Sequence, residues 1–276
     1  MSRCSENGSG RAGESRTSRV RSRALDVAVV MPAYNEAEGI GGFVREIEEA
    51  FCGLGVRVIV VDDASTDHTA QVLRDLDSTQ VLVVESTENQ GHGASTLRAL
   101  AEGLATNAPI IIAVDGDGQF LGSDLIRLYR TVAESDADVV DGVRQGRGDP
   151  LYRRLVAMVT RVLVWERSGV RPGDANTSLR AYRSAALRSL LAGAEADWLT
   201  PNLQFSAVAR RSDLRIAEIP VTSIPRRGAS TVGTMWHSSG RTLPSRRFLR
   251  FTVQAAAQWR TARTRDDRGD RGGRDT

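Results

Sequence analysis

The sequence predicts an α/β protein built on a mostly parallel, doubly wound sheet with helices on both faces. Short runs rich in Val and Ile alternate with longer segments whose apolar residues recur at helical spacing. Strands of a parallel sheet are buried on both faces and are joined by helices, so they read as continuous apolar runs. The apolar runs also end in polar, glycine-containing or acidic loops, which is typical of a sheet that binds ligands at its carboxyl edge.

The N-terminal half is expected to supply the strands and crossover helices of this sheet. Strands are predicted at residues 26–31, 56–61, 80–85, 109–114 and 138–142, and helices at residues 38–51 and 69–76, in a segment ending at residue 105, and at residues 124–134. The first helix shows the pattern on one face in Ile40, Phe43, Val44, Ile47 and Phe51. No internal repeat is present, so we expect a single domain.

After residue 148 the pattern changes to a long amphipathic helix at about 151–165, a loop, a second helix and a short strand at residues 215–219. We interpret this half as the side of the molecule that receives an acceptor. The long helix carries an apolar stripe of Leu151, Leu155, Val159, Val162 and Trp165. The stripe favours packing against the core, with contact to lipid as the alternative.

Length and composition divide the 276 residues into one folded domain and three flanking segments. The domain is expected at residues 24–235, while the polar residues 1–23 and 261–276 predict disordered tails. Residues 236–260 predict a basic amphipathic helix with Phe248, Phe251, Ala255 and Trp259 on one face. Contact with a membrane interface and packing onto the domain fit this helix equally well.

Charge and hydropathy exclude several classes of protein. All 37 basic residues are Arg, so a single exposed Arg carries little functional meaning. The net charge of +3 combines +4 over residues 1–23 and +6 over residues 241–276 with −7 over the remainder, and an acidic body argues against nucleic-acid binding. No apolar run reaches the roughly 18 residues of a membrane span, and no secretory signal is present. We therefore expect a cytosolic or peripherally attached protein.

The most informative segment is Asp115-Gly116-Asp117-Gly118-Gln119, which follows the fourth apolar run. In extended geometry its two carboxylates and its amide would share one face. Hard divalent cations prefer such oxygen ligands, and Mg²⁺ or Mn²⁺ commonly completes its shell with substrate phosphates. A plain turn is the alternative, because Asp and Gly are turn residues. The polar ends of the other strands favour the metal site.

An acidic pair, Asp62 and Asp63, ends the second apolar run. Thr66 or Asp67 behind it is expected to cap the next helix. A cap does not explain the pair itself, and a carboxylate at this place could accept hydrogen bonds from a nucleobase or a ribose hydroxyl.

A glycine-containing loop, ENQGHGAS, follows the third run and opens a helix whose N-terminus suits an anion. The spacing of a nucleotide-binding P-loop is missing. We interpret His92 in this loop as a loop or phosphate-contact residue rather than a metal ligand.

Seven segments resemble glycosyltransferase family 2 in order and spacing: VVMPAYNEAEGI, VIVVDDASTDHT, NQGHGAS, VDGDGQF, DVVDGVRQGRG, DANTSLRAYR and EIPVTSIPRRGAST. The likeness covers about residues 26–233 and is strongest to the dolichol-phosphate mannosyltransferase and polyprenyl-phosphate glycosyltransferase branch. It implies a GT-A fold, inversion at the anomeric carbon and a requirement for Mg²⁺ or Mn²⁺.

The resemblance also implies roles for particular residues on the donor side. Pro32, Tyr34 and Glu36 would frame the nucleoside, and Asp63 would reach the base. Asp115 and Asp117, with Gln119, would hold the metal, the diphosphate and the ribose.

On the acceptor side, Arg144 and one of Arg153 or Arg154 would face the diphosphate and the acceptor phosphate. Asp174 would lie near the acceptor. The segment from Arg226 and Arg227 to Ser230 would close over the phosphates.

The chain departs from the family pattern at three places. Ser178 stands where the family's SGFR segment has Gly, Thr231 stands where a Lys follows the basic loop, and His92 replaces the Lys of a GKG segment. The chain contains no Lys, so two of these changes follow its composition. They also fit a different acceptor or a weakly active enzyme.

The resemblance implies a hexosyltransferase that moves sugar from a nucleotide-diphosphate sugar to a polyprenyl (dolichyl-type) phosphate at a membrane surface. A phosphate acceptor is already ionised, whereas a hydroxyl acceptor needs a base, for which Asp174 is the candidate. Two alternatives stay open: a family 2 enzyme with a soluble or secondary-metabolite hydroxyl acceptor, and a non-catalytic nucleotide-sugar-binding protein. We expect a cytoplasmic protein that lies peripherally at the inner face of the cell membrane. A membrane partner protein is compatible with this expectation, and no nucleic-acid partner is expected.

Overall fold

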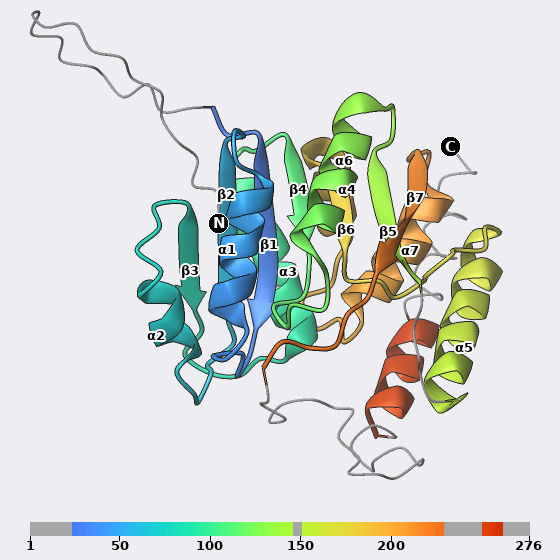
Figure 1. The fold of residues 1–276 in the computed structure, drawn as a ribbon. Coiled ribbons are helices and arrows are strands. Elements are labelled where there is room, and N and C mark those ends of the chain that lie inside the picture. Colours follow the sequence, from blue (N-terminus) through green and yellow to red (C-terminus); the bar gives the residue numbers. More distant parts are fainter. Residues whose placement is uncertain (1–23, 146–150, 229–249, 262–276) are drawn as a thin grey trace, which may run out of the picture.

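The computed structural model describes residues 24–145, 151–228 and 250–261, with side chains of the middle segment described from Arg154 onward (Figure 1). Residues 1–23 and 262–276 of the predicted tails, and residues 236–249 of the predicted basic helix, lie outside these ranges, whereas Thr261, predicted as the first residue of the tail, ends a helix. The N-terminal half alternates strands and helices as the sequence predicts. Its elements are β1 (Val27–Ala33), α1 (Ile40–Ala50), β2 (Val56–Asp62), α2 (Thr69–Arg74), β3 (Val81–Glu85), α3 (His92–Ala105), β4 (Ile110–Ala113), α4 (Gly122–Glu134) and β5 (Val139–Gln145).

The second half contributes α5 (Leu151–Ser168), β6 (Arg180–Arg183), α6 (Ser184–Ala192), α7 (Pro201–Arg211) and β7 (Ile216–Thr222). Residues 250–261 form a further helix, named the C-terminal helix below. One helix was expected between α5 and the last strand, and the structure has two. β6 was not predicted, because its sequence Arg-Ala-Tyr-Arg lacks an apolar run.

The seven strands form one sheet in the order β3-β2-β1-β4-β6-β5-β7. β1 pairs in parallel with β2 and β4, β2 with β3, and β5 with β7. β6 is antiparallel to both of its neighbours, β4 and β5. The prediction of a mostly parallel α/β sheet is therefore confirmed, with β6 as its antiparallel insertion.

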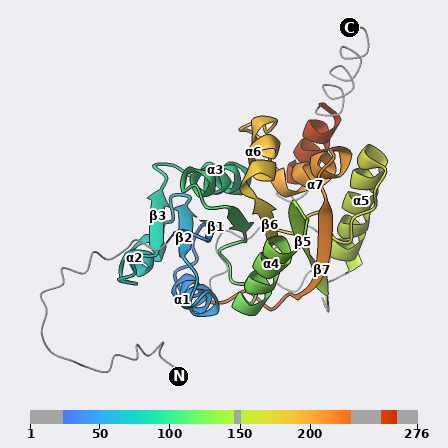
Figure 2. The ribbon, with the colours of Figure 1, turned by 90° about the horizontal axis from the view of Figure 1, so that it is seen from above.

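Helices cover both faces of the sheet, with α1 and α4 on one side and α3, α6 and α7 on the other (Figure 2). Successive residues of a strand point alternately into the two layers of helices. On β1, Val27, Val29 and Met31 join the core under α1 and α4, whereas Ala28 and Val30 join the core under α3. This period of two explains why the strands read as unbroken apolar runs.

The C-terminal helix packs onto the domain through one face. Trp259 is buried in a small core with Val164 of α5 and Leu203 of α7, and the guanidinium of Arg167 lies 4.7 Å from the centre of its ring. Gln258 accepts a hydrogen bond from the N–H of Leu199 at 2.9 Å. Residues 250–261 therefore pack onto the domain through this face, as one of the two alternatives predicted, while Phe248 lies outside the described ranges.

The apolar stripe of α5 does not face the core. Leu155, Val159, Val162 and Trp165 are 45–55% exposed, so the prediction that the stripe packs inside is wrong for these four residues. The opposite side of α5 carries the fully buried Val164. In the part of the chain that the structure describes, no helix is both long and apolar enough to cross a bilayer.

Candidate active site

The candidate site lies where the winding of the sheet reverses. β1 and β4 are neighbours, but the chain leaves β1 toward β2 and β3 and returns through α3 to β4. The carboxyl ends of β1 and β4 therefore lie side by side at this point, which is the usual place of a ligand site in an open α/β sheet. The loops that follow these two strands, residues 34–39 and 114–121, contain residues that the sequence singles out.

The loop after β1 is fastened to the loop after β2 by Asn35, a buried residue with φ of 55°. Its side-chain oxygen accepts hydrogen bonds from the N–H groups of Thr66 at 2.8 Å and Asp67 at 3.3 Å. Its own N–H donates to the hydroxyl of Ser65 at 2.9 Å. This cross-link holds the backbone next to the half-buried Tyr34.

Asp63, predicted to reach a nucleobase, is buried at the end of β2 and holds the loop that opens α3. Its two carboxylate oxygens accept hydrogen bonds from the N–H groups of Gln90 at 2.8 Å and Gly91 at 2.9 Å. Its carbonyl accepts a hydrogen bond from the side chain of Asn89 at 3.2 Å. The structure thus gives Asp63 a loop-positioning role, and a base would have to share the same oxygens.

The acidic segment after β4 is a turn rather than an extended strand. The expectation that its two carboxylates and its amide share one face assumed extended geometry, and that assumption was wrong. The N–H of Gly116 donates to the carbonyl of Pro32 at 3.1 Å. A Cβ on Gly116 would lie 2.8 Å from that oxygen, and Gly118 has φ of +65°, so both glycines are needed. The turn brings Asp115 and Asp117 together against the end of β1.

Asp117 of this turn and the neighbouring Glu36 lie in surroundings that favour their protonated forms. Burial raises the pKa of Asp117 to about 7, and the charges of Asp115 and Glu36 add to the shift. Burial also raises the pKa of Glu36 to about 7, even though Arg226 pairs with it. A bound cation would oppose both shifts, because it favours the ionised form of each carboxyl.

Arg226 joins the segment after β7 to the loop after β1. It donates to both carboxylate oxygens of Glu36, from Nε at 3.0 Å and from Nη2 at 2.5 Å. Arg226 and Glu36, predicted for phosphate and nucleoside respectively, therefore bind each other.

Arg227, predicted to contact phosphate, instead anchors this segment to the acidic turn. Its Nε donates to the carbonyl of Gly118 at 3.0 Å, its Nη2 donates to the carbonyl of Phe120 at 3.3 Å, and its Nη1 pairs with Glu46 of α1. The backbone N–H of Arg227 also donates to the carbonyl of Asp117 at 3.1 Å. These contacts favour a structural role for Arg227.

Asp115 and Asp117 are the two carboxylates of the turn that could hold a divalent cation. Gln119 stands beside them, and its backbone N–H donates to Asp117 Oδ1 at 3.1 Å. Within the described ranges, no three acidic, His or Cys side chains are arranged to hold a metal ion by themselves. A metal here would need further oxygens from its ligand, as Mg²⁺ and Mn²⁺ commonly take from phosphates.

Arg144 and Asp174, both predicted as acceptor-side residues, form a two-point ion pair. Arg144 Nε lies 2.6 Å from Asp174 Oδ2, and Nη2 lies 3.0 Å from Oδ1. Nη2 also donates to the carbonyl of Asn176 at 3.1 Å. The side chains are only 16% and 15% exposed, so the pair is partly withdrawn from water.

A buried ionic network supports this pair, and sequence reasoning missed it. Asp141 of β5 binds Arg180 Nε at 2.9 Å and Arg210 Nη2 at 2.7 Å, with all three side chains at most 4% exposed. Arg210 also pairs with Glu218, whose carboxylate accepts the N–H of Gly173 at 2.9 Å. The signal was present, because Asp141 and Arg180 lie in the DVVDGVRQGRG and DANTSLRAYR segments.

The same network reaches the backbone around Asp174. Arg180 donates to the carbonyls of Ala175 at 3.2 Å and Asn202 at 2.7 Å. Residues 173–176 are therefore held in place by hydrogen bonds with Glu218, Arg180 and Arg144. This explains how an acceptor-side loop without regular structure keeps a defined position.

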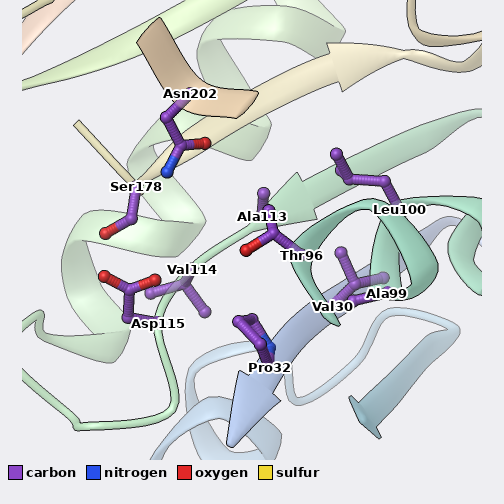
Figure 3. Close-up of a pocket in the computed structure, with 10 residues that line it drawn as sticks. All are labelled: Val30, Pro32, Thr96, Ala99, Leu100, Ala113, Val114, Asp115, Ser178 and Asn202. Atoms are coloured by element: carbon purple, nitrogen blue, oxygen red, sulfur yellow. The ribbon is translucent and has the colours of Figure 1, made fainter. Parts of the chain in front are cut away.

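A small cavity connects the acidic turn with this side of the site (Figure 3). Pro32 lines it from β1, Asp115 from the acidic turn, Thr96 from α3, and Ser178 and Asn202 from the acceptor side. In Figure 3 the carboxylate of Asp115 and the hydroxyl of Ser178 point toward each other. The departure from the family pattern at Ser178 therefore places a hydroxyl beside the acidic turn.

The remaining predicted residues are placed as follows. His92 Nε2 lies 3.7 Å from Asp115 Oδ1 at the start of α3, which brings it to the site without a hydrogen bond. Arg154 is exposed in the first turn of α5. The side chain of Arg153, and Ser230, lie outside the described residues.

The doubly wound sheet with an acidic turn at its switch point is a GT-A fold. Solved structures support this class. Mannosyl-3-phosphoglycerate synthase from Rubrobacter xylanophilus is 19% identical, with a TM-score of 0.58 over 88% of this chain and 75% of its own. A mannosyltransferase from Pyrobaculum calidifontis, in complex with GDP-Man and Mn²⁺, is 24% identical, with a TM-score of 0.52 over 74% of this chain and 58% of its own.

The chain belongs to glycosyl transferase family 2, which matches residues 28–191. Curated relatives are undecaprenyl-phosphate 4-deoxy-4-formamido-L-arabinose transferases. That of Salmonella paratyphi B is 30% identical over 201 residues, or 71% of this chain and 58% of its own length. That of Edwardsiella ictaluri is 29% identical over 215 residues, or 76% and 63%. The family resemblance is confirmed, and the chain spans less than two thirds of the length of these relatives.

Proposed function

We propose that this protein is an inverting, metal-dependent glycosyltransferase that moves a sugar from a nucleotide-diphosphate sugar to a polyprenyl phosphate. The observation that carries the proposal is the acidic turn at the switch point, where Asp115 and Asp117 lie beside Glu36 and burial raises the pKa of Asp117 to about 7. Membership of family 2 supports the reaction class. The undecaprenyl-phosphate acceptors named for the relatives support the acceptor class.

In this proposal the donor lies across the ends of β1 and β4. Pro32 and Tyr34 frame the nucleoside from the loop that Asn35 holds in place. Glu36 either contacts the nucleoside and releases Arg226 toward the diphosphate, or stays paired with Arg226. Asp63 acts by holding the loop at the start of α3.

Mg²⁺ or Mn²⁺ fits the acidic turn by the chemistry of its donors. Two carboxylates and the amide of Gln119 offer the hard oxygen ligands that these ions prefer. When bound with the donor, the ion would stabilise the negative charge of the departing nucleotide diphosphate. The Mn²⁺ in the Pyrobaculum calidifontis complex supports the choice of ion.

On the acceptor side, we propose that Arg144 binds the acceptor phosphate. A phosphate oxygen attacks the anomeric carbon, a C–O bond forms, and the bond to the nucleotide diphosphate breaks on the opposite face with its electron pair leaving. The phosphate is ionised beforehand, so positioning and Arg electrostatics suffice. Both oxygens of Asp174 accept hydrogen bonds from Arg144, which favours a positioning role for Asp174 over that of a base.

The acceptor is tested by following a radiolabelled donor sugar. With UDP- and GDP-sugars and Mn²⁺, label should move to the organic phase in the presence of polyprenyl phosphate and stay aqueous with a panel of hydroxyl acceptors. Arg144→Gln should lower transfer to the phosphate by about 100-fold while donor affinity changes little, because charge-assisted contacts to the acceptor are lost. Label on a hydroxyl acceptor alone would overturn the phosphate assignment.

Metal affinity should depend on pH in a defined direction. With a pKa of about 7, Asp117 is mostly protonated at about pH 6 and mostly ionised at about pH 8. A proton competes with the metal, so apparent affinity for Mn²⁺ should rise with pH by up to about tenfold per unit below pH 7 and level off above it. Titration of Mn²⁺ by electron paramagnetic resonance checks this, and an affinity that is flat over this range would contradict it.

We place this activity in the cytoplasm, peripherally at the inner face of the cell membrane, because the proposed acceptor is a membrane lipid. The proposal is compatible with a membrane partner protein. The proposal includes no nucleic-acid partner, since the body between the basic ends carries a charge of −7.

A further inference from the structure

The bare side of α5 is the largest concentration of exposed apolar residues in the described structure. Leu155, Met158, Val159, Val162 and Trp165 are 45–55% exposed. At about 100° per residue they fall within an arc of about 120° on one side of the helix. These five residues are named the α5 stripe below.

The exposed apolar residues cluster around this stripe. Of the eight large hydrophobic side chains exposed in the described ranges, seven lie on α5, just after it at Val170, or on the C-terminal helix at Val253; the other is Leu82 of β3. α5 and the C-terminal helix lie beside each other past the β7 end of the sheet, whereas β3 is at the opposite edge (Figures 1 and 2). Scattered single residues are common on protein surfaces, but a clustered patch marks an interaction site.

The charges on these two helices are mainly positive. Arg154 on α5 and Arg250 and Arg260 on the C-terminal helix are exposed. Glu166 is the only acid of α5, and the C-terminal helix has none. An apolar stripe with a basic rim is complementary to an anionic bilayer, in which acyl chains accept the stripe and lipid phosphates attract the arginines.

We propose that the α5 stripe and the C-terminal helix form the surface on which this protein docks to an anionic lipid bilayer. The stripe lies in the plane of the interface and does not span the membrane. Arg144, near the end of β5, and Asp174, which follows α5 in the chain, lie at the two chain connections of this helix. Docking through α5 therefore brings the lipid phosphates close to the acceptor pair, a consequence that rests on the proposed function, whereas docking itself rests on the surface alone.

The experiment is co-sedimentation of the full chain with vesicles, either of phosphatidylcholine alone or containing phosphatidylglycerol. The double variant Leu155→Gln/Val162→Gln keeps good helix formers at both positions and removes apolar burial. We expect it to bind phosphatidylglycerol vesicles about tenfold more weakly than the wild type. Leu82→Gln is the matched control, because it removes an exposed leucine (42%) at the far edge of the sheet, and it should bind like the wild type.

The charge component has its own variant. Arg154→Gln/Arg260→Gln should reduce the preference for phosphatidylglycerol over phosphatidylcholine several-fold and should make binding less sensitive to salt. Equal binding of the wild type and the stripe variant to both vesicles would overturn the proposal. A stripe variant that loses self-association in analytical ultracentrifugation, with no vesicle binding by the wild type, would overturn it in favour of an interface between two copies.

Failure of the proposed function has a separate signature. The stripe variant should keep wild-type nucleotide binding and wild-type transfer to a short-chain, water-soluble polyprenyl phosphate, and should lose transfer only to the long-chain acceptor in vesicles. Vesicle binding by a wild-type protein that transfers sugar to neither acceptor would leave the docking surface in place and refute the proposed function. Loss of transfer to the short-chain acceptor in a folded stripe variant would show that α5 belongs to the active site instead.

Discussion

Asp117→Ala is expected to lower glycosyl transfer by at least about 100-fold and to abolish the metal-dependent part of nucleotide binding. Asp117 lies in the turn between the ends of β1 and β4, where two carboxylates meet with little positive charge. Removing one of them takes away a ligand and part of the electrostatic stabilisation of the leaving diphosphate. Turnover and calorimetric titration of UDP and GDP, each with and without Mn²⁺, measure the two effects.

The stability of this variant separates loss of function from loss of fold. The pKa of Asp117 is raised by burial and by like charge, so its ionised form opposes folding at pH values above its unfolded pKa. Without metal, Asp117→Ala should therefore melt at or above the wild-type temperature near neutral pH. Asp136→Ala, which removes a side chain that is 92% exposed, should leave activity unchanged. Full wild-type activity in the presence of a chelator would refute the metal role.

Asp141→Ala is expected to lower the free energy of unfolding by about 3–5 kcal/mol, because it leaves buried arginines without their counter-charge. Asp141 binds Arg180 at 2.9 Å and Arg210 at 2.7 Å, and its side chain is 1% exposed. The same change should loosen residues 173–176, which this network holds. Urea denaturation gives the stability, and hydrogen exchange of these residues reports the loop.

An exposed ion pair provides the matched control. Arg74 and Glu85 pair on the surface with side chains 57% and 51% exposed, so Glu85→Ala should cost less than about 1 kcal/mol. If Asp141→Ala proves too unstable to purify, Asp141→Asn keeps the volume and part of the hydrogen bonding and should show a smaller loss. A cost for Asp141→Ala no larger than that for Glu85→Ala would show that the network contributes little.

Much of the candidate site was predictable because its residues follow strands whose apolar runs are easily recognised. In a doubly wound sheet the carboxyl ends of β1 and β4 meet at the switch point, so residues as far apart as Glu36 and Asp117 were expected together. Arg144 and Asp174 were likewise assigned to one acceptor side, and they bind each other. The roles of the individual residues were not predictable in the same way.

Arg227 shows the reason for this limit. Its segment was expected to close over phosphates, yet its guanidinium is held by Gly118, Phe120 and Glu46. These partners lie far away in the sequence, and no local pattern indicates that they surround one side chain. Asp63 behaves similarly, because its oxygens hold the loop before α3.

The sequence by itself determined the fold class, the order of most strands and helices, and the place of the acidic segment after the fourth strand, because these follow from local periodicity and from the residues at strand ends. Only the tertiary structure decided which side of α5 is bare, since an amphipathic helix reads the same whether its stripe meets a core or solvent. It also decided the insertion of β6 into the sheet. Arg180 of this strand is buried because Asp141 on the neighbouring strand β5 neutralises its charge. Burial and pairing depend on residues that are distant in the chain, and that information exists only once the chain has folded.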